Sequence, residues 1–324
     1  MATLYLTEAD VTGLVDIRDA IDAVTEAFRR LAAGEAENVP RRRCRTGGAM
    51  LHSMSAAAGY LGRLGWKQYA TTRGSAHFLF GLHDAASGEL LALMEADRLG
   101  QLRTGAATAV AVSCMAAPEG TEMGLLGTGL QARSQLAAVA AVRSLSCAFV
   151  YGRDTQRREA FAREMAEQLK LDVVPVDRPS EAAEDLAIVV TATSSREPVL
   201  NGSWLDEGAV VCAIGSNALS RAEIDAATVR RADHIVCDSI EACKLEAGDF
   251  ADALARGGFD WSRAVELADV VAGRAVGRSH SGGLGLFKSV GLAIEDLALG
   301  SMVYDRARER GIGRESLAVG PMVS

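Results

Sequence analysis

The segment that decides the fold is Met123-Gly124-Leu125-Leu126-Gly127-Thr128-Gly129-Leu130-Gln131-Ala132. It contains an apolar run typical of a strand, a G-x-G-x-x-A turn, and the start of an alanine-rich helix expected over 130–143. The first glycine permits a tight turn, the second lets the backbone approach a pyrophosphate, and the alanine permits close packing of helix and strand. The N-terminus of the helix adds N–H groups and the positive end of its dipole. The motif predicts a dinucleotide-binding loop; a glycine-rich turn without a ligand is the alternative.

Further apolar runs after this segment alternate with helical segments. Strands are expected at 123–126, 147–151, 173–176, 188–191, 209–214 and 235–238, with a second helix over 155–169. Alternating strands and helices at this spacing are typical of an α/β protein with a parallel sheet. The sequence therefore predicts a doubly wound parallel sheet of the Rossmann type.

The N-terminal third has a different pattern. Residues 7–33 show helical spacing in two pieces, with Thr7 as an N-cap and Asp10 three positions later. Short segments at 66–71, 76–83 and 90–95 are separated by glycine and serine turns, which predicts an antiparallel meander. Helices are expected at 103–114 and over 291–310, where Glu295 and Asp296 resemble ordinary polar helix positions. A chain of 324 residues is long enough for two domains.

The charge balance excludes several classes of partner. The chain has 34 Lys and Arg residues against 42 Asp and Glu residues, a net charge of −8. We therefore expect no nucleic-acid partner and no acidic membrane surface.

The apolar runs are too short to span a bilayer. The first ten residues lack the apolar core of a signal peptide, and no cysteine lies in a C-x-x-C pair. We expect a cytoplasmic protein without a metal site.

The end of the second expected strand bears on the cofactor. Sites for NAD place an acid there for the ribose hydroxyls, whereas sites for NADP use basic or small residues. Here the strand is followed by Gly152, Arg153 and Asp154. This favours NADP(H), with NAD(H) as the alternative because of Asp154. Arg153 as an ordinary surface charge is the other interpretation.

Three cations ahead of the expected parallel sheet are candidates for binding an anionic substrate. Lys67 lies in an apolar strand segment, where a charge is costly unless it is paired or exposed. Arg103 follows a short loop and opens a helix, and Arg43 lies in a basic cluster. Two arginines can hold a carboxylate in bidentate fashion. The alternatives are an outward-facing lysine and solvated surface arginines.

Six segments, in order along the chain, are together similar to the ornithine cyclodeaminase/μ-crystallin family. They are Gly65-Trp66-Lys67, Leu102-Arg103-Thr104-Gly105-Ala106-Ala107, Gly127-Thr128-Gly129-Leu130-Gln131-Ala132, Thr191-Ala192-Thr193, Gly215-Ser216-Asn217 and Leu286-Phe287-Lys288-Ser289-Val290-Gly291. The resemblance implies a homodimer. It also implies a discontinuous α+β substrate-binding and dimerisation domain, formed by 1–115 and 300–324, around a Rossmann domain at 116–299.

The resemblance also implies roles for particular residues. Lys67, Arg43 and Arg103 match residues that hold the α-carboxylate of the substrate, and Val290 matches a further substrate contact. Arg43 is chosen within the cluster by its spacing to Met54 and Lys67. Together with the three residues after the second strand, the resemblance gives sixteen expected cofactor contacts. They are Arg103, Thr104, Gly127, Gly129, Leu130, Gln131, Gly152, Arg153, Asp154, Thr193, Ile214, Gly215, Ser216, Asn217, Arg221 and Ser289.

Asn217 is an informative departure from the family. Ornithine cyclodeaminases resemble this chain but have an aspartate there, and an amide does not titrate. This disfavours ornithine cyclodeaminase. The resemblance instead implies a reductase of small imines bearing an α-carboxylate, such as Δ1-pyrroline-2-carboxylate or Δ1-piperideine-2-carboxylate, with Lys67 and Asn217 as catalytic residues. An amino-acid dehydrogenase or opine-type reductive amination, and a non-catalytic NADPH-dependent binding protein, are the alternatives.

Overall fold

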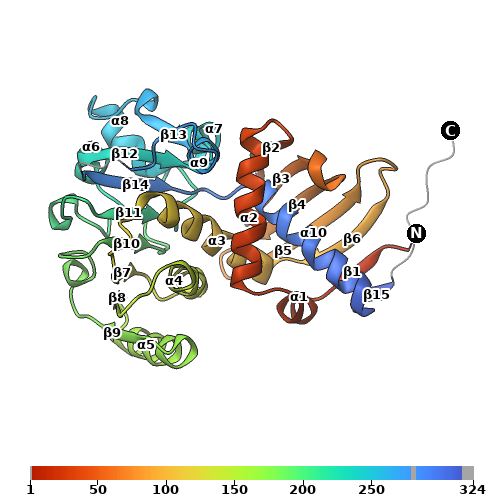
Figure 1. The fold of residues 1–324 in the computed structure, drawn as a ribbon, viewed down its shortest axis with the longest axis horizontal. Coiled ribbons are helices and arrows are strands. Elements are labelled where there is room, and N and C mark those ends of the chain that lie inside the picture. The colour runs from red at the N-terminus through yellow and green to blue at the C-terminus, as the bar shows by residue number, and fades with distance from the viewer. Residues whose placement is uncertain (1, 279–281, 316–324) are drawn as a thin grey trace. The chain divides into compact units, whose positions relative to one another are not determined.

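A computed structural model describes residues 2–278 and 282–315. Contacts divide the chain into two compact units. Residues 1–103 and 292–324 form the first, here called the antiparallel unit, and residues 104–291 form the second, called the parallel unit. Figure 1 labels the helices and strands of both.

The parallel unit contains the doubly wound sheet that the sequence predicts. Within the described residues its strand order is β13-β12-β14-β11-β10-β7-β8-β9, and every neighbouring pair is parallel. The strands are β7 (Glu122–Leu126), β8 (Cys147–Tyr151), β9 (Asp172–Pro175), β10 (Ile188–Thr191), β11 (Val210–Ala213), β12 (Ala232–Cys237), β13 (Ala264–Glu266) and β14 (Leu284–Lys288). The strand order reverses between β7 and β10, and open α/β sheets bind ligands at such a point.

Helices connect these strands. They are α4 (Leu130–Val142), α5 (Thr155–Leu169), α6 (Ala226–Arg231), α7 (Ile240–Glu246), α8 (Ala251–Ala255) and α9 (Leu267–Val271). Short 3₁₀ turns lie at Pro179–Ala182, Gly202–Trp204, Gly248–Phe250 and Trp261–Arg263. In Figure 1, α4 and α5 lie beside the β7–β9 end of the sheet, and α6 to α9 lie beside β12 and β13. The expected strands and both expected helices of this unit are therefore confirmed.

The sequence did not indicate β14 as a strand, although it lies inside the sheet between β11 and β12. All five of its residues are buried, including Lys288 at its end. A run that contains a glycine and ends in a lysine shows no strand periodicity. Its extended conformation is stabilised by ladders to two neighbours, which are distant in sequence.

The antiparallel unit is a sheet covered by helices. In the described residues its strand order is β15-β1-β6-β5-β4-β3-β2. The strands are β1 (Leu4–Leu6), β2 (Ala36–Thr46), β3 (Ala49–Ala58), β4 (Arg63–Thr71), β5 (Ala76–Asp84), β6 (Leu90–Glu95) and β15 (Arg314–Glu315), with a 3₁₀ turn at Gly59–Leu61. The predicted meander is confirmed, and β2 and β3 extend it. The helices are α1 (Glu8–Leu14), α2 (Ile17–Ala32), α3 (Asp97–Met115) and α10 (Ala293–Arg310), and Thr7 and Asp10 form the capping box of α1.

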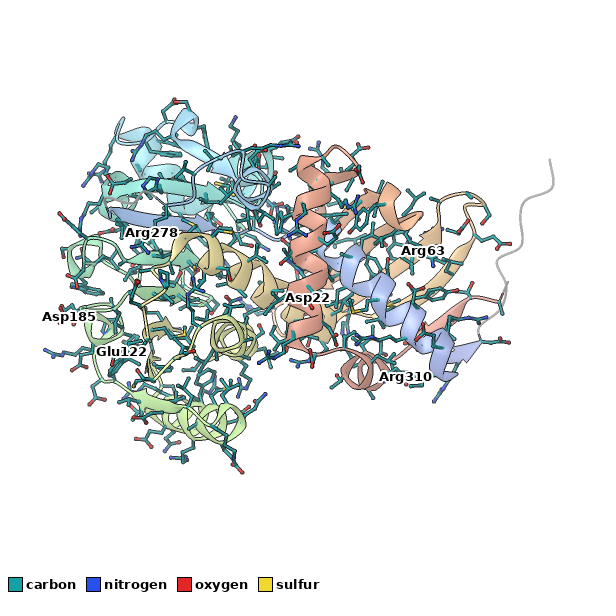
Figure 2. All side chains as sticks on the ribbon, in the orientation of Figure 1. Asp22, Arg63, Glu122, Asp185, Arg278 and Arg310 are labelled. Carbon is teal, nitrogen blue, oxygen red and sulfur yellow. The ribbon has the colours of Figure 1, made fainter. Side chains whose placement is uncertain are left out.

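Helix α10 covers one face of this sheet. It packs on β3 and β4, and α2 packs beside it (Figure 1). Gly65 allows the close approach, because a Cβ there would lie 2.9 Å from the Leu297 side chain. Arg63, labelled in Figure 2, forms an ion pair with Asp305 of α10 at 3.2 Å. Gly65, Lys67 and Tyr69 are the buried residues of β4 and stand at every second position. They therefore share the face of the sheet that α10 covers.

The compact units divide the chain at 103/104 and 291/292, whereas the domain boundaries expected from the sequence are 115/116 and 299/300. Helix α3 therefore contributes to both units. Its residues from Thr104 onward pack within the parallel unit, where a Cβ on Gly105 would lie 2.6 Å from the carbonyl oxygen of Ser134. Helix α10 belongs entirely to the antiparallel unit because its buried face packs on that unit's sheet.

Candidate functional site

The glycine loop after β7 has the geometry of an anion-binding turn. Gly127 has φ +125°, and a Cβ there would lie 2.3 Å from the carbonyl oxygen of Ala192. Gly129 is the N-cap of α4, with no side chain capping the first turn, and a Cβ there would meet nothing within 4 Å. The backbone at Gly129 is therefore open to a ligand, and the N-terminus of α4 offers N–H groups to it. These residues fit the pyrophosphate of a dinucleotide.

The residues after β8 have distinct roles. Gly152 is buried, and a Cβ there would lie 2.8 Å from the methyl group of Thr128. Arg153 is exposed. Asp154 is the N-cap of α5, and its side chain accepts a hydrogen bond from the backbone N–H of Arg157 at 3.0 Å. This carboxylate is therefore engaged with the helix that follows it.

A buried aspartate organises the residues after β14. The Asp238 carboxylate accepts hydrogen bonds from the Ser289 hydroxyl at 2.9 Å and from the backbone N–H groups of Val290 and Gly291 at 2.7 Å each. The Ser289 hydroxyl thus donates to the protein itself. Val290 is 4% exposed, and Asp238 was not among the residues that the sequence indicated.

Five more predicted contacts of the parallel unit lie just after the carboxyl ends of β10 and β11, namely Thr193, Ile214, Gly215, Ser216 and Asn217. The backbone N–H groups of Thr193 and Gly215 both donate to Glu223, and the Ser216 hydroxyl donates to the Arg221 carbonyl at 3.1 Å. Ile214 is buried and Asn217 is half-buried. Arg221 is exposed, and so is Leu130. Thr104 and Gln131 lie on α3 and α4, where Thr104 is buried and Gln131 is half-buried.

In the antiparallel unit the two predicted cations Lys67 and Arg103 are buried and paired with carboxylates. Lys67 Nζ donates to Asp296 Oδ1 at 2.8 Å. Arg103 donates to Glu295 Oε2 at 2.7 Å, and its Nε lies 3.4 Å from Asp296 Oδ1. The expectation that Glu295 and Asp296 are ordinary polar helix positions is wrong, because both are completely buried. Their partners lie 192 and 229 residues away in sequence.

The charges of this cluster nearly cancel. Burial lowers the pKa of Lys67, and the Asp296 carboxylate opposes this effect. Burial also acts to lower the pKa of Arg103, but Asp296 and Glu295 hold it above its ordinary value. Counted by residue type, the two cations Lys67 and Arg103 are matched by the two acids Asp296 and Glu295. Arg41 is 6% exposed, and its charge lowers the pKa of Lys67. Counted by residue type, the cluster of Arg41, Lys67, Arg103, Glu295 and Asp296 therefore has a formal charge of +1.

Arg43, chosen from the sequence, is bound to a histidine. Its Nε donates to His52 Nδ1 at 3.1 Å. Burial, with the charges of Arg43 and Arg41, lowers the pKa of His52 to about 4. The imidazole is therefore neutral at pH 7, and its Nε2–H donates to the Thr71 hydroxyl at 3.1 Å. The role of Arg43 in substrate binding stays a prediction, and the more deeply buried Arg41 is its structural alternative.

An aromatic row lines the same face of the sheet. The rings of His52 and Tyr69 stack at 4.1 Å, and those of Tyr69 and Phe78 stack at 4.8 Å. Lys67 Nζ lies 5.5 Å from the centre of the Phe78 ring, and Arg41 lies 6.0 Å from that of Tyr69. The inward face thus combines flat apolar surfaces with fixed positive charge.

Residues 2–278 and 282–315 contain no group of three or more His, Cys, Asp or Glu side chains suited to a metal ion. Within the same residues no helix combines the length and the apolar character needed to cross a membrane.

Comparison with known proteins yields consistent matches. A sequence profile of the ornithine cyclodeaminase/mu-crystallin family matches residues 1–311. A Δ1-pyrroline-2-carboxylate reductase of Bacillus cereus is 33% identical over 235 residues, which cover 72% of either chain. An alanine dehydrogenase of Archaeoglobus fulgidus is 31% identical over 326 residues, covering 97% of this chain and 98% of the relative.

The fold is also shared with a solved structure. The Δ1-pyrroline-2-carboxylate reductase of Thermococcus litoralis, solved in complex with NADH and L-proline, superposes with a TM-score of 0.93. The two proteins are 33% identical, and the match covers 97% of this chain and all of the other.

Proposed function

Because the chain belongs to the ornithine cyclodeaminase/mu-crystallin family, we propose that it is an NAD(P)H-dependent reductase of small imines bearing an α-carboxylate. Δ1-Pyrroline-2-carboxylate and Δ1-piperideine-2-carboxylate are the proposed substrates, and L-proline and L-pipecolate are the products. The buried cluster with a formal charge of +1 is the observation that carries this proposal. The names of the relatives from Bacillus cereus and Thermococcus litoralis support it.

The proposed reaction adds a hydride and a proton across C=N. The reduced nicotinamide, when bound, supplies the hydride for the imine carbon. Arg103, together with Arg43 or Arg41, holds the carboxylate and thereby fixes the orientation of the imine. Lys67 donates a proton to the imine nitrogen, because burial makes its ammonium more acidic. Asn217 contributes hydrogen bonds only, since its amide does not titrate.

Steady-state assays test the proposed function. Oxidation of NADPH or NADH is measured with each cyclic ketimine over pH 5–10. Failure to oxidise either cofactor with either ketimine would overturn it. Binding of NADPH without turnover would instead support a non-catalytic binding protein.

Reductive amination is a second candidate, favoured by the similarity to an alanine dehydrogenase over nearly the whole chain. It uses the same residues but begins from a 2-oxo acid and an amine. Turnover of pyruvate with ammonia, compared with turnover of the preformed cyclic imine, separates the two activities. Ornithine cyclodeamination stays disfavoured because Asn217 lacks a titrating carboxyl.

NADP(H) is the proposed cofactor, with NAD(H) as the alternative. Arg153 is exposed next to the loop, and the Asp154 carboxylate is engaged as a helix cap. We expect Arg153→Ala to weaken NADPH binding about tenfold, through loss of a charge-assisted contact with the 2′-phosphate, and to leave NADH binding unchanged. Fluorescence titration measures both. Arg163→Ala, at another exposed arginine further along α5, is the control. A variant that loses NADPH and NADH affinity equally would contradict the assignment.

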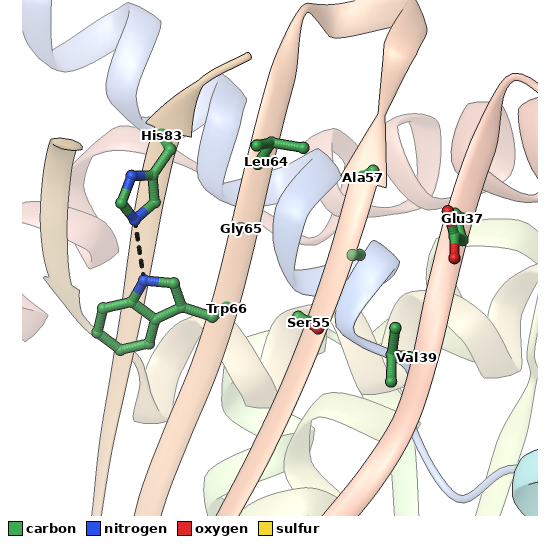
Figure 3. Close-up of a pocket in the computed structure, with 9 residues that line it drawn as sticks. Glu37, Val39, Ser55, Ala57, Leu64, Gly65, Trp66 and His83 are labelled. Carbon is green, nitrogen blue, oxygen red and sulfur yellow. Dashed lines mark hydrogen bonds between the residues drawn. The ribbon is translucent and has the colours of Figure 1, made fainter. Parts of the chain in front are cut away.

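A homodimer is proposed through the face of the antiparallel sheet that α10 leaves uncovered. Val39, Leu51, Leu64 and Leu79 are each 37–41% exposed. All four point away from α10, as the strand alternation and register require. Figure 3 shows part of this face, a hollow of about 390 Å³ beside Trp66, whose Nε1–H donates to His83. An exposed apolar patch on a sheet is typical of a protein interface.

We expect Leu64→Glu to weaken self-association by about 100-fold, because it buries an unpaired charge in the proposed interface. Size-exclusion chromatography with light scattering measures the mass. Leu254→Glu, at a similarly exposed leucine of α8, is the control and leaves the mass unchanged. A wild-type protein that is monomeric at micromolar concentration would refute the dimer.

A further inference from the structure

Glu223 is a completely buried carboxylate that the proposed chemistry does not use. It lies between β11 and α6 and accepts three hydrogen bonds. The donors are the Thr191 hydroxyl at 3.0 Å and the backbone N–H groups of Thr193 at 2.6 Å and Gly215 at 2.5 Å. A single side chain thus joins the carboxyl end of β10 to that of β11.

Two further buried charges hold this carboxylate in place. Asp249 Oδ1 accepts the backbone N–H of Glu223 at 2.6 Å and that of Ile224 at 3.3 Å. Lys288 Nζ lies 2.7 Å from Asp249 Oδ2 and donates to the Ser216 carbonyl at 2.7 Å. Lys288 is the last residue of β14, so this cluster connects the ends of three neighbouring strands.

Stabilisation of the fold is by itself a weak reason to bury Glu223, Asp249 and Lys288 together. Buried ion pairs cost desolvation that apolar residues avoid, and replacing them with apolar side chains is often neutral or stabilising. Burial raises the pKa of the Glu223 carboxyl, while the three donors aimed at it favour the carboxylate. What the cluster does define is loop geometry. A Cβ on Gly215 would lie 2.2 Å from the Thr193 carbonyl oxygen, so the two loops are fixed against each other.

The position of these loops indicates which part of a dinucleotide they face. In this fold each half of the sheet binds one mononucleotide, and the ribose-recognising position after β8 belongs to the adenosine half. The loops after β10 and β11 lie across the switch point from β8. They therefore belong to the half that takes the nicotinamide mononucleotide.

We propose that Glu223, held by Asp249 and Lys288, is a positioning residue that shapes the nicotinamide half of the dinucleotide site. It acts through the backbone of Thr193 and Gly215. This inference rests on the proposed function, because it presupposes a nicotinamide cofactor.

Glu223→Gln tests the inference. The amide retains one acceptor oxygen and turns an NH₂ group toward a backbone N–H, so Thr193 or Gly215 loses its acceptor. We expect the Kd for NADH and for NADPH to rise by about tenfold or more, and the Kd for AMP, which carries only the adenosine half, to change less than about twofold. Fluorescence titration and calorimetry measure the three ligands.

Asp225→Asn is the matched control. Asp225 also accepts three hydrogen bonds, from the Gly202 N–H and from the backbone and hydroxyl of Thr228, on segments away from the strand ends. It is expected to lower the melting temperature without changing any of the three Kd values. If Glu223→Gln does not fold, Thr191→Val removes one donor at constant volume. The Kd for NADH and for NADPH is then expected to rise about threefold, with the Kd for AMP unchanged.

Equal losses of affinity for NADH and AMP, or no loss for either in the folded variant, would overturn the inference. A wild-type protein that binds neither NADH nor NADPH would instead refute the proposed function. The two failures are therefore distinguishable.

Discussion

Lys67→Met is expected to lower kcat/KM for imine reduction by about 10³-fold while NADPH binding stays unchanged. The substitution removes the proposed proton donor and one of the three cations of the cluster. Methionine roughly retains the length and apolar contacts of the lysine stem, so the packing against Phe78 is retained. Steady-state kinetics with Δ1-pyrroline-2-carboxylate measures the loss, and a direct titration with NADPH measures cofactor binding.

The control for this variant is one residue away. Gln68 is exposed on the opposite face of β4, so Gln68→Met makes the same side chain without touching the cluster. Its kcat/KM is expected to stay within about twofold of the wild type. A Lys67→Met enzyme that retains more than about a tenth of the wild-type activity would rule out Lys67 as the proton donor.

Asp296→Asn is expected to lower the free energy of unfolding by about 3–5 kcal/mol, because it leaves buried positive charge without its partner. The same substitution is also expected to change the pKa of Lys67. Asp296 opposes the lowering of the Lys67 pKa, whereas burial, Arg103 and Arg41 all lower it. Without Asp296 the pKa falls further, so Lys67 loses its proton at lower pH. The alkaline limb of the kcat/KM profile should move down by about 1–3 pH units.

Urea unfolding and the pH dependence of kcat/KM measure these two effects. Asp305→Asn, on the same helix but with a 56% exposed side chain paired to Arg63, is the matched control. Its stability should change by less than about 1 kcal/mol and its pH profile should not move. If Asp296→Asn leaves the alkaline limb in place, Asp296 does not control the protonation of Lys67.

The glycine loop and most of the parallel sheet were predictable because their signals are local. A strand, a G-x-G-x-x-A turn and an alanine-rich helix occupy 22 consecutive residues, 122–143, and each follows from its immediate neighbours. Lys67 was also recognisable, because a cation in an apolar strand segment needs a reason. Arg103 was recognisable from its place after a short loop and within the segment 102–107 that resembles the family. Their partners were not, since Glu295 and Asp296 have the spacing of ordinary polar helix residues.

Long-range pairing decided the remaining features. Strand β14 is extended because β11 and β12 bond to its two sides. Glu223 is important because it joins two strand ends, yet nothing in its neighbouring residues marks it. Nothing in the sequence around Arg41 marks it either. The register of β2 against β3 shifts between Val39 and Arg42, and this shift distinguishes Arg41 from the other arginines of its cluster.

The sequence by itself determined the α/β class, the glycine-rich loop, the family and two of the cations that we propose to face the substrate. Those properties depend on short-range periodicity, backbone conformation and contiguous motifs. Only the tertiary structure decided which carboxylates pair with the cations, which charges hold the loops after β10 and β11, and that the formal charge of the cluster is +1. An ion pair between residues 229 positions apart depends on how the chain packs, and burial, which sets the cost of each charge, exists only after it has packed.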